Sequence, residues 1–462
     1  MRITVNTRLT KTGFDVIVQK KVHAVNYPPE VWQAFPQEFK QPYSEFVAFI
    51  RTIHSTFTPS VTIHYLFPPP LGEALFNYGL ILAMPENLFD YPKSKRKTSD
   101  YLRLGFNSFF KSEFTGIAPP LTQTKAYLPQ KNVALLPFSF GKDSLLTYAL
   151  GKEIGLKFTA IFFIDADKVF ENKHKLRLSK KFTREFMQDI LLFKVPIQNL
   201  QQARGFWWGW DLMLTQYTIF LIPFMHYYRP QYFLWSNEYD RNFTANDEEG
   251  FITNPTFDQS GHWMQTLNSI LRLYGINTQL GSLIDSLSEL GVLAILHQRF
   301  PETAKYQSSC FNEAPTSATQ RWCGDCDECA KVYVFLKAIG VDPQTVDFKD
   351  DMLNRRGKSL YAIFPEKQKT EDYWQDKFPF FREEKLYAFY LAHLRGTRGK
   401  YIEQFRKLYL QVAQEKSSGW RRTYFSMHPS QSCPETLLDR AVPIFTNELE
   451  KTRRDISRLN IR

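Results

Sequence analysis

The chain has 462 residues, a net charge of +11 and an aromatic fraction of 16%. Its length favours two to three domains, and its apolar and charged fractions, 43% and 23%, are typical of a globular protein. No N-terminal signal peptide pattern is visible, and the longest apolar stretch, residues 217–225, is much shorter than the ~20 residues of a membrane span. The sequence therefore predicts a soluble, cytoplasmic protein without a membrane span.

The positive charge is concentrated near the C-terminus. Residues 352–462 hold 22 Lys and Arg against 13 Asp and Glu, so this segment carries +9 of the net +11. Such a segment either meets an anion, such as nucleic acid, a nucleotide or a membrane surface, or forms the solvated face of helices. The second interpretation is the more common one for a basic helical segment.

Three segments follow one another along the chain. Residues 1–130 combine an alternating, strand-like start with proline-rich breaks and a helical stretch, which predicts an N-terminal α+β domain with a role in substrate recognition. Residues 131–350 contain an apolar run (133–138), a polar loop, a helical run (145–153) and a second apolar run (158–164). This order predicts a βαβ unit of a parallel sheet. Residues 351–462 have helical periodicity and predict a basic helical extension.

The loop between the first apolar run and its helix has the composition of a polyphosphate site. Its residues are Ser139, Phe140, Gly141, Lys142, Asp143 and Ser144. Unpaired backbone N–H groups and the helix dipole favour an anion at a helix N-terminus, while the lysine adds positive charge and the serines add hydroxyl donors. The aspartate could cap the helix or hold Mg²⁺. The plain alternative is an N-capped helix without a ligand.

Four of the five cysteines are clustered, with Cys310 followed by Cys323, Cys326 and Cys329. Two-residue spacers let thiolates of a tight turn face one centre, Gly324 permits the turn, and four thiolates satisfy tetrahedral Zn²⁺. Disulfides are disfavoured in a cytoplasmic chain, and an iron–sulfur cluster is the second alternative. With no open ligand position, a Zn²⁺ ion here would be structural.

These motifs resemble those of PP-loop ATP pyrophosphatases, whose loop reads S-G-G-x-D-S, with Phe140 in place of the first glycine. A loop of this kind followed by a late cysteine knot is similar to the zinc-containing branch with 7-cyano-7-deazaguanine synthase. A closer resemblance is to the MurL-type UDP-N-acetylmuramoyl-L-alanyl-L-glutamate epimerases. It covers about residues 130–350, and the matching stretches are 141–145, 236–238, 286–290, 308–310 and 321–329. The resemblance implies an α/β fold with a parallel-sheet PP-loop core.

The resemblance further implies that ATP, with Mg²⁺, is split into AMP and pyrophosphate at the loop and that a substrate carboxylate receives the AMP. Adenylation removes the negative charge of the carboxylate, so that a base can take the α-proton and reprotonation can invert the centre. Lys142 and Asp143 are the expected catalytic residues of the loop. Glu238, after a strand end, is the preferred base over Asp240, Asp247 and His262. The end of the second apolar run, with Phe163 and Asp165, is the expected adenine site, and the aromatic segment 205–211 could stack a base or sugar.

Other functions remain open at the level of sequence. A related adenylating enzyme could form an amide or a nitrile, and a nucleic-acid-modifying PP-loop protein could use the basic extension to grip phosphate. The spacing of four of the five cysteines predicts a metal site, which counts against RNA thiolation because that reaction uses a catalytic cysteine. The expected partner is therefore a small molecule or a nucleotide-sugar peptide, and nucleic acid is the second candidate.

Overall fold

The computed structural model describes residues 1–90, 96–118, 126–166, 168–197, 200, 212–310, 313, 319–355, 360–364 and 378–459. The chain divides into two compact units. The first comprises Met1–Leu135, Lys194–Phe233 and Arg241–Leu280, and the second comprises Leu136–Phe193, Leu234–Asp240 and Gly281–Arg462. The loop, Glu238, the four clustered cysteines and the C-terminal segment therefore all belong to the second unit.

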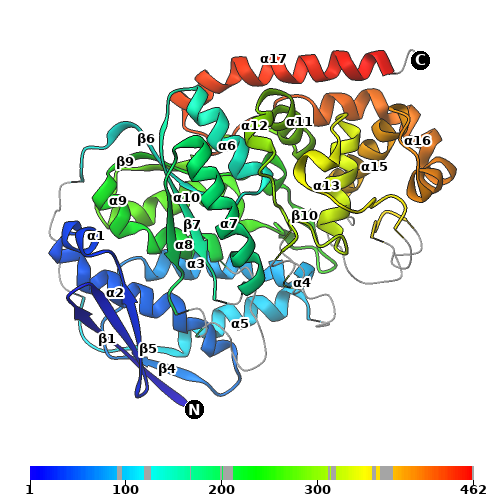
Figure 1. The fold of residues 1–462 in the computed structure, drawn as a ribbon. Coiled ribbons are helices and arrows are strands. Elements are labelled where there is room, and N and C mark those ends of the chain that lie inside the picture. The colour runs from blue at the N-terminus through cyan, green and yellow to red at the C-terminus, as the bar shows by residue number, and fades with distance from the viewer. Residues whose placement is uncertain are drawn as a thin grey trace. The chain divides into compact units, whose positions relative to one another are not determined.

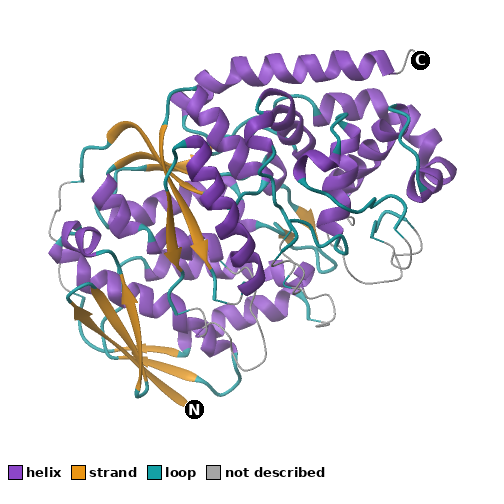
Figure 2. Cartoon of the chain, in the orientation of Figure 1, coloured by secondary structure: helices purple, strands orange, loops and turns teal. Residues whose placement is uncertain are grey.

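The first unit begins with a mixed sheet, drawn in orange near the N-terminus in Figure 2. Its strands are β1 (Arg2–Thr10), β2 (Gly13–Val18), β3 (Lys21–Asn26), β4 (Thr62–Tyr65) and β5 (Ser112–Phe114), in the order β3-β2-β1-β4-β5. The alternating start of the sequence predicts paired strands, and β1 and β2 do pair antiparallel. Strand β1 also pairs with β4 in parallel, so the helices between them form a crossover.

Helices and short segments complete the first unit. They are α1 (Pro29–Ala34), α2 (Gln37–Thr52), η1 (Ile53–Phe57), α3 (Glu73–Ala83), η2 (Met84–Glu86), α4 (Asn87–Asp90), α5 (Thr98–Phe110), α8 (Met213–Phe220), α9 (Ile222–Tyr228), η6 (Phe257–Gln259) and α10 (Gly261–Leu273), with the two-residue strands β10 (Ala245–Asn246) and β11 (Ile252–Thr253). Aromatic rings fill its core. Tyr27 stacks on Trp32, and the Tyr27 and Tyr43 hydroxyls lie 2.6 Å apart in full burial.

A second sheet has the strand order β12-β9-β6-β7-β8. Its strands are β6 (Gln130–Pro137), β7 (Lys157–Ile164), β8 (Ile190–Lys194), β9 (Pro230–Trp235) and β12 (Gln279–Ser282). The predicted apolar runs 133–138 and 158–164 correspond to β6 and β7, and the predicted helical run lies within α6 (Lys142–Glu153). Strands β6 and β9 pair in parallel. The protein is therefore α/β, as the sequence predicts.

Helices dominate the second unit, including the C-terminal segment drawn from yellow to red in Figure 1. They are α6, α7 (Val169–Phe186), α11 (Glu289–Arg299), α12 (Pro301–Ala304), α13 (Asp327–Ala338), η8 (Pro343–Val346), α15 (Pro379–Leu394), α16 (Lys400–Tyr424) and α17 (Glu435–Leu459); η5 (Tyr239–Asn242) follows β9. Helix α11 packs on α6 and α17, and α13 packs on α15. None of the described helices combines the length and apolar content that a membrane span requires.

Candidate functional site

The loop between β6 and α6 contains a phenylalanine in a conformation that glycine usually adopts. Phe140 has φ +63°, in the left-handed region, whereas Gly141 has an ordinary φ of −68°. The Phe140 ring is fully buried and packs edge-on against Phe138 and Phe182, at centroid distances of 4.8 and 5.8 Å. A bulky residue in this region is strained, and the buried ring offsets the strain. The backbone therefore adopts at Phe140 the conformation that a glycine would otherwise provide.

Helix α6 begins directly after this turn without a side-chain cap. Gly141 is its N-cap and the Gly141 carbonyl accepts from Leu145 N, but no side chain caps the first turn. The first backbone N–H groups of a helix have no partner within the helix. The Ser139 and Ser144 hydroxyls lie 3.5 Å apart beside these N–H groups. The start of α6 thus presents N–H donors, two hydroxyls and the positive end of the helix dipole, which are suited to an anion.

Lys142 points into a set of carboxylates. Its Nζ lies 3.0 Å from both Asp143 carboxylate oxygens, 3.0 Å from Glu238 Oε1 and 3.5 Å from Glu289 Oε1. Burial alone would lower the pKa of Lys142, but Asp143, Glu238 and Glu289 outweigh it and hold that pKa well above its usual value. The lysine is therefore charged at neutral pH, and its charge is already shared by three acids.

Two hydrogen bonds to backbone carbonyls explain why Glu238 and Glu289 meet although 51 positions separate them. Tyr239 N donates to the Leu287 carbonyl, and Ser282 Oγ donates to the Asn237 carbonyl, so the segment after β9 lies beside the segment after β12. Glu289 is the first residue of α11, and its neighbour Ser288 caps that helix by accepting from Gly291 N. The acid at this position is favoured by the helix dipole.

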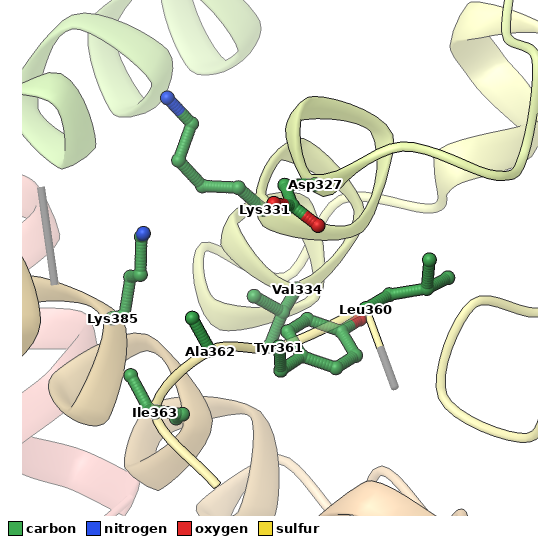
Figure 3. Close-up of a pocket in the computed structure, with 8 residues that line it drawn as sticks. All are labelled: Asp327, Lys331, Val334, Leu360, Tyr361, Ala362, Ile363 and Lys385. Atoms are coloured by element: carbon green, nitrogen blue, oxygen red, sulfur yellow. The ribbon is translucent and has the colours of Figure 1, made fainter. Parts of the chain in front are cut away.

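Helices α13 and α15 add further charges to this cluster. Lys331 of α13 lies 3.1 Å from Glu289 Oε1 and 2.9 Å from Glu328 Oε2. Glu384 of α15 accepts from Leu290 N at 2.9 Å. Burial, followed by the charge of Glu289, raises the pKa of Glu384 well above its usual value. Figure 3 shows Lys331 beside Lys385 of α15, with both amino groups directed away from the Tyr361 ring.

Three of the acids form a group with the composition of a cation site. Oxygens of Glu238, Asp240 and Glu289 lie within 4.8 Å of one another, and each of these residues is at most 3% exposed. Carboxylate oxygens are the ligands that Mg²⁺ prefers. Two ammonium groups, those of Lys142 and Lys331, already offset part of the negative charge. Asp143, whose side chain is 29% exposed, is the most accessible acid of the cluster.

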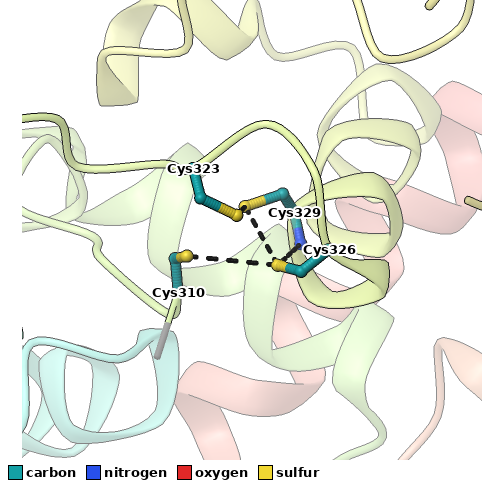
Figure 4. Close-up of side chains that lie close together, drawn as sticks. All are labelled: Cys310, Cys323, Cys326 and Cys329. Carbon is teal, nitrogen blue, oxygen red and sulfur yellow. Dashed lines mark hydrogen bonds between the residues drawn. The ribbon is translucent and has the colours of Figure 1, made fainter. Parts of the chain in front are cut away.

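The four clustered cysteines converge as the spacing predicts. In Figure 4 the sulfurs of Cys326 and Cys329, at the start of α13, face those of Cys310 and Cys323. The sulfur–sulfur distances are 4.0 Å for Cys310–Cys326, 3.7 Å for Cys323–Cys329 and 3.4 Å for Cys326–Cys329. Tetrahedral Zn²⁺ with bonds of ~2.3 Å requires sulfurs about 3.8 Å apart. None of the four forms a disulfide, so the cluster can hold a metal ion and is consistent with Zn²⁺.

Gly324 forms the turn between the first two cysteines of the knuckle. Its φ is +64°, and a Cβ there would lie 2.4 Å from Arg355 Nη1 and 2.6 Å from Asp350 Oδ2. A larger residue would therefore strain the turn and collide with an ion pair. Cys326 also caps α13, because its sulfur accepts from Cys329 N. The same few residues thus set both the turn and the direction of the thiols.

The other predicted site residues lie in different surroundings. Phe163, at the end of β7, stacks on Trp235 at 6.4 Å and meets Phe193 edge-on, which is ordinary aromatic packing. The Asp165 carbonyl accepts from Asn172 Nδ2 at the start of α7. In the first unit, Asp247 accepts from the N–H groups of a turn and His262 is exposed on α10. Segment 205–211 lies outside the described residues.

Sequence reasoning missed several members of the buried cluster. Lys331 and Glu384 follow no motif, because each is an ordinary charged position in a helical pattern. Glu289 lies in the stretch 286–290 that carries part of the family resemblance, but the residue types alone assign it no role. Only the packing of α11, α13 and α15 brings these groups to Lys142.

Comparison with models of protein families, with curated proteins and with solved structures finds no match for this chain. The resemblance to PP-loop enzymes therefore rests on the sequence motifs, and it stays a prediction.

Proposed function

We propose that the loop Ser139–Phe140–Gly141–Lys142–Asp143–Ser144 binds the phosphates of ATP and that the protein is an ATP pyrophosphatase-type enzyme. The observation that carries the proposal is the left-handed turn at Phe140, which leads into an uncapped helix start. Strained residues concentrate at functional sites, and an uncapped helix start is an anion site. Gly141 supports the same conclusion, because its φ is ordinary and a Cβ would meet only Ser139 Oγ, at 3.3 Å. Among the described residues only this one tight contact disfavours a Cβ at position 141, whereas a closely approaching phosphate would exclude it.

The exposure of each loop residue indicates whether it can contact the ligand or serves to fix the loop. The α6 N–H groups and the exposed Ser139 hydroxyl hold phosphate oxygens, and the partly exposed Asp143 faces the ligand or its Mg²⁺. Ser144 is 3% exposed and donates to the Gly141 carbonyl, so it reaches a phosphate only if that hydrogen bond is exchanged. Lys142 is 5% exposed and paired with acids, so we assign it to fixing the start of α6 against Glu238 and Glu289. The carboxylates of Glu238, Asp240 and Glu289 form an alternative Mg²⁺ site, which excludes Glu238 as a base while the ion is bound. In this scheme ATP is a substrate, and adenine is received near Phe163 and Asp165.

The proposed reaction is the activation of a substrate carboxylate. A carboxylate oxygen attacks the α-phosphorus, pyrophosphate leaves, and an acyl adenylate forms. The proposed substrate is the terminal L-glutamate of UDP-N-acetylmuramoyl-L-alanyl-L-glutamate. A base removes its α-proton from the acyl adenylate, and a proton is returned on the other face. Hydrolysis of the adenylate then releases the inverted carboxylate and AMP. Glu238 is the proposed base, and its 1% exposure requires that the substrate displace Lys142 from it. A related amide- or nitrile-forming synthase shares every step up to the adenylate.

For the cysteine cluster we propose a structural Zn²⁺ ion. Four thiolates would fill the tetrahedral coordination sphere and leave no position for substrate. The ion would tie the segment around Cys310 to the start of α13, and α13 carries Lys331 of the charge cluster. The ion would hold these thiolates together and would take no part in the reaction.

Product analysis tests the proposal. The purified protein is incubated with ATP, Mg²⁺ and the muropeptide in deuterated water, beside the Gly141→Ala variant as the matched control. Formation of AMP and pyrophosphate by the wild type alone supports the loop assignment, and deuterium at the α-carbon of glutamate identifies the epimerase. ADP as the product, or no turnover with any carboxylic acid tested, would refute the proposed reaction. AMP formation without deuterium exchange would favour the amide- or nitrile-forming class.

A further inference from the structure

The first unit contains a cavity of about 450 Å³, which is in the size range of small-molecule sites. One face of α2, the segment 68–75 leading into α3, Ala118 and Leu273 surround it. Most of the wall is apolar, from Phe39, Pro42 and three consecutive prolines at 68–70. Proline has a fixed φ, so this part of the wall is rigid before any ligand arrives.

Three carboxylates line the same cavity. Glu38 and Glu45 lie seven positions apart and therefore on one face of α2, and Glu73 is the first residue of α3. Glu45 is 8% exposed and Glu73 is 9% exposed, whereas Glu38 is exposed. Two acids that are more than nine-tenths buried thus line a space that could hold a ligand.

The part of the chain that the structure describes supplies no ion pair to these acids. Glu45 Oε1 accepts from Gln41 Nε2 at 2.8 Å, and Glu73 Oε1 accepts from Asn77 Nδ2. Within the described residues, neither of the two Oε2 atoms has a hydrogen-bond partner, and no lysine, arginine or histidine pairs with any of the three glutamates. Burial raises the pKa of Glu45 and that of Glu73. A buried carboxylate without a cation is unfavourable, so the cavity is complementary to a positive charge.

We propose that this cavity binds an organic ammonium ion with an apolar body. The ammonium group would donate to Oε2 of Glu45 or of Glu73, while the apolar body would contact Phe39 and the prolines. A charge-assisted hydrogen bond to a buried carboxylate is roughly twice as strong as a neutral one. The site lies within the first unit, and its occupation is independent of the ATP reaction proposed for the second unit.

Isothermal titration calorimetry with three probes of similar shape tests the proposal. The probes are 2-phenylethylamine, its neutral analogue 2-phenylethanol, and the anion 3-phenylpropionate, each titrated up to about 10 mM so that millimolar affinities are detected. We expect the amine to bind at least about tenfold more tightly than the alcohol, which corresponds to one buried charge pair of modest strength. The anion should not bind. This comparison needs only the wild-type protein and no ATP.

Variants then locate the site. Of Glu45→Gln and Glu73→Gln, which keep the size and one oxygen of each side chain, the variant that removes the partner of the ammonium group should weaken the amine about tenfold, and both should leave the alcohol unchanged. Glu30→Gln changes an exposed acid of the same unit outside the cavity and is the matched control, and circular dichroism checks that all three variants fold. Equal affinity for amine and alcohol, binding that neither cavity variant weakens, or no binding of any probe would overturn the proposal.

Discussion

The strained turn at Phe140 gives a prediction whose sign can be worked out from the backbone. Replacing Phe140 by Ala or by Gly removes the same buried ring, at a cost of about 3–5 kcal/mol in either case. The two variants differ only in how well they adopt φ +63°. Alanine in the left-handed region costs roughly 1–2 kcal/mol, whereas glycine adopts it freely.

Glycine has an opposing entropic cost, because the unfolded chain of the glycine variant is more flexible and loses more freedom on folding. That cost is about 0.5–1 kcal/mol relative to alanine in ordinary conformations. We therefore expect Phe140→Gly to be more stable than Phe140→Ala by up to about 1 kcal/mol, although both are less stable than the wild type. At a position with negative φ the order would be reversed.

Urea unfolding followed by circular dichroism and by tryptophan fluorescence measures the difference. Comparing two variants that share one cavity removes most of the uncertainty of the cavity term. Gly141→Ala serves as the internal control: its φ of −68° suits alanine, but alanine is a poorer N-cap and its Cβ would lie 3.3 Å from Ser139 Oγ, so a loss of no more than about 1 kcal/mol is expected. If Phe140→Ala is the more stable of the pair, the backbone at 140 is not left-handed and the argument for the phosphate loop loses its main support.

Four further predictions concern the same unit. Gly141→Ala should fold normally but bind ATP at least about tenfold more weakly in calorimetry, and unchanged affinity would contradict a close phosphate. Lys142→Met should lower the free energy of unfolding by about 3–5 kcal/mol, since it removes the ammonium group that faces the buried Glu238 and leaves Lys331 as the cation beside Glu289; a change below about 1 kcal/mol would contradict the pairing. The folded-state pKa of Glu384 is raised, so its contribution to stability is lost as pH rises above about 4.5 through that pKa. The free energy of unfolding of Glu384→Gln, relative to that of the wild type, should therefore increase between pH 5 and 8, and a decrease would refute this. Cys326→Ser should reduce bound zinc from about one ion per chain to nearly none and lower the melting temperature, whereas full retention of zinc would refute a four-thiolate site.

Local chemistry made part of this protein predictable from its sequence. The cysteine knuckle is predictable because two-residue spacers and Gly324 restrict the thiols to one turn, and no distant packing is needed. The strands β6 and β7 and the helix α6 are predictable because continuous apolar runs and a helical period are local signals. The loop itself was expected from serine, glycine and lysine, but the sequence gives no reason to expect a phenylalanine with positive φ. That conformation depends on Phe138 and Phe182, and Phe182 lies on another helix.

The buried charge cluster could not be predicted, because its members come from five separate segments. Lys142 belongs to α6, Glu238 follows β9, Glu289 begins α11, and Lys331 and Glu384 lie on α13 and α15. A charged residue in a helical pattern is solvated in most proteins, so none of these positions indicates burial by itself. Their burial follows from tertiary packing, in which each ammonium group lies between acids.

The C-terminal segment shows how net charge and local function can differ. Its excess of +9 favoured a solvated helical face over a surface for an anion, and the residues that reach the cluster include an acid, Glu384, which accepts from the first turn of α11. Farther along, the His428 ring stacks on Tyr239 at 3.8 Å, directly beside Glu238, and the Tyr424 carbonyl accepts from Ser288 Oγ. The strand end and the helix start that enclose Lys142 are therefore both held by this segment. A basic segment that supplies an acid and two neutral contacts beside a buried cluster acts there through packing and hydrogen bonds.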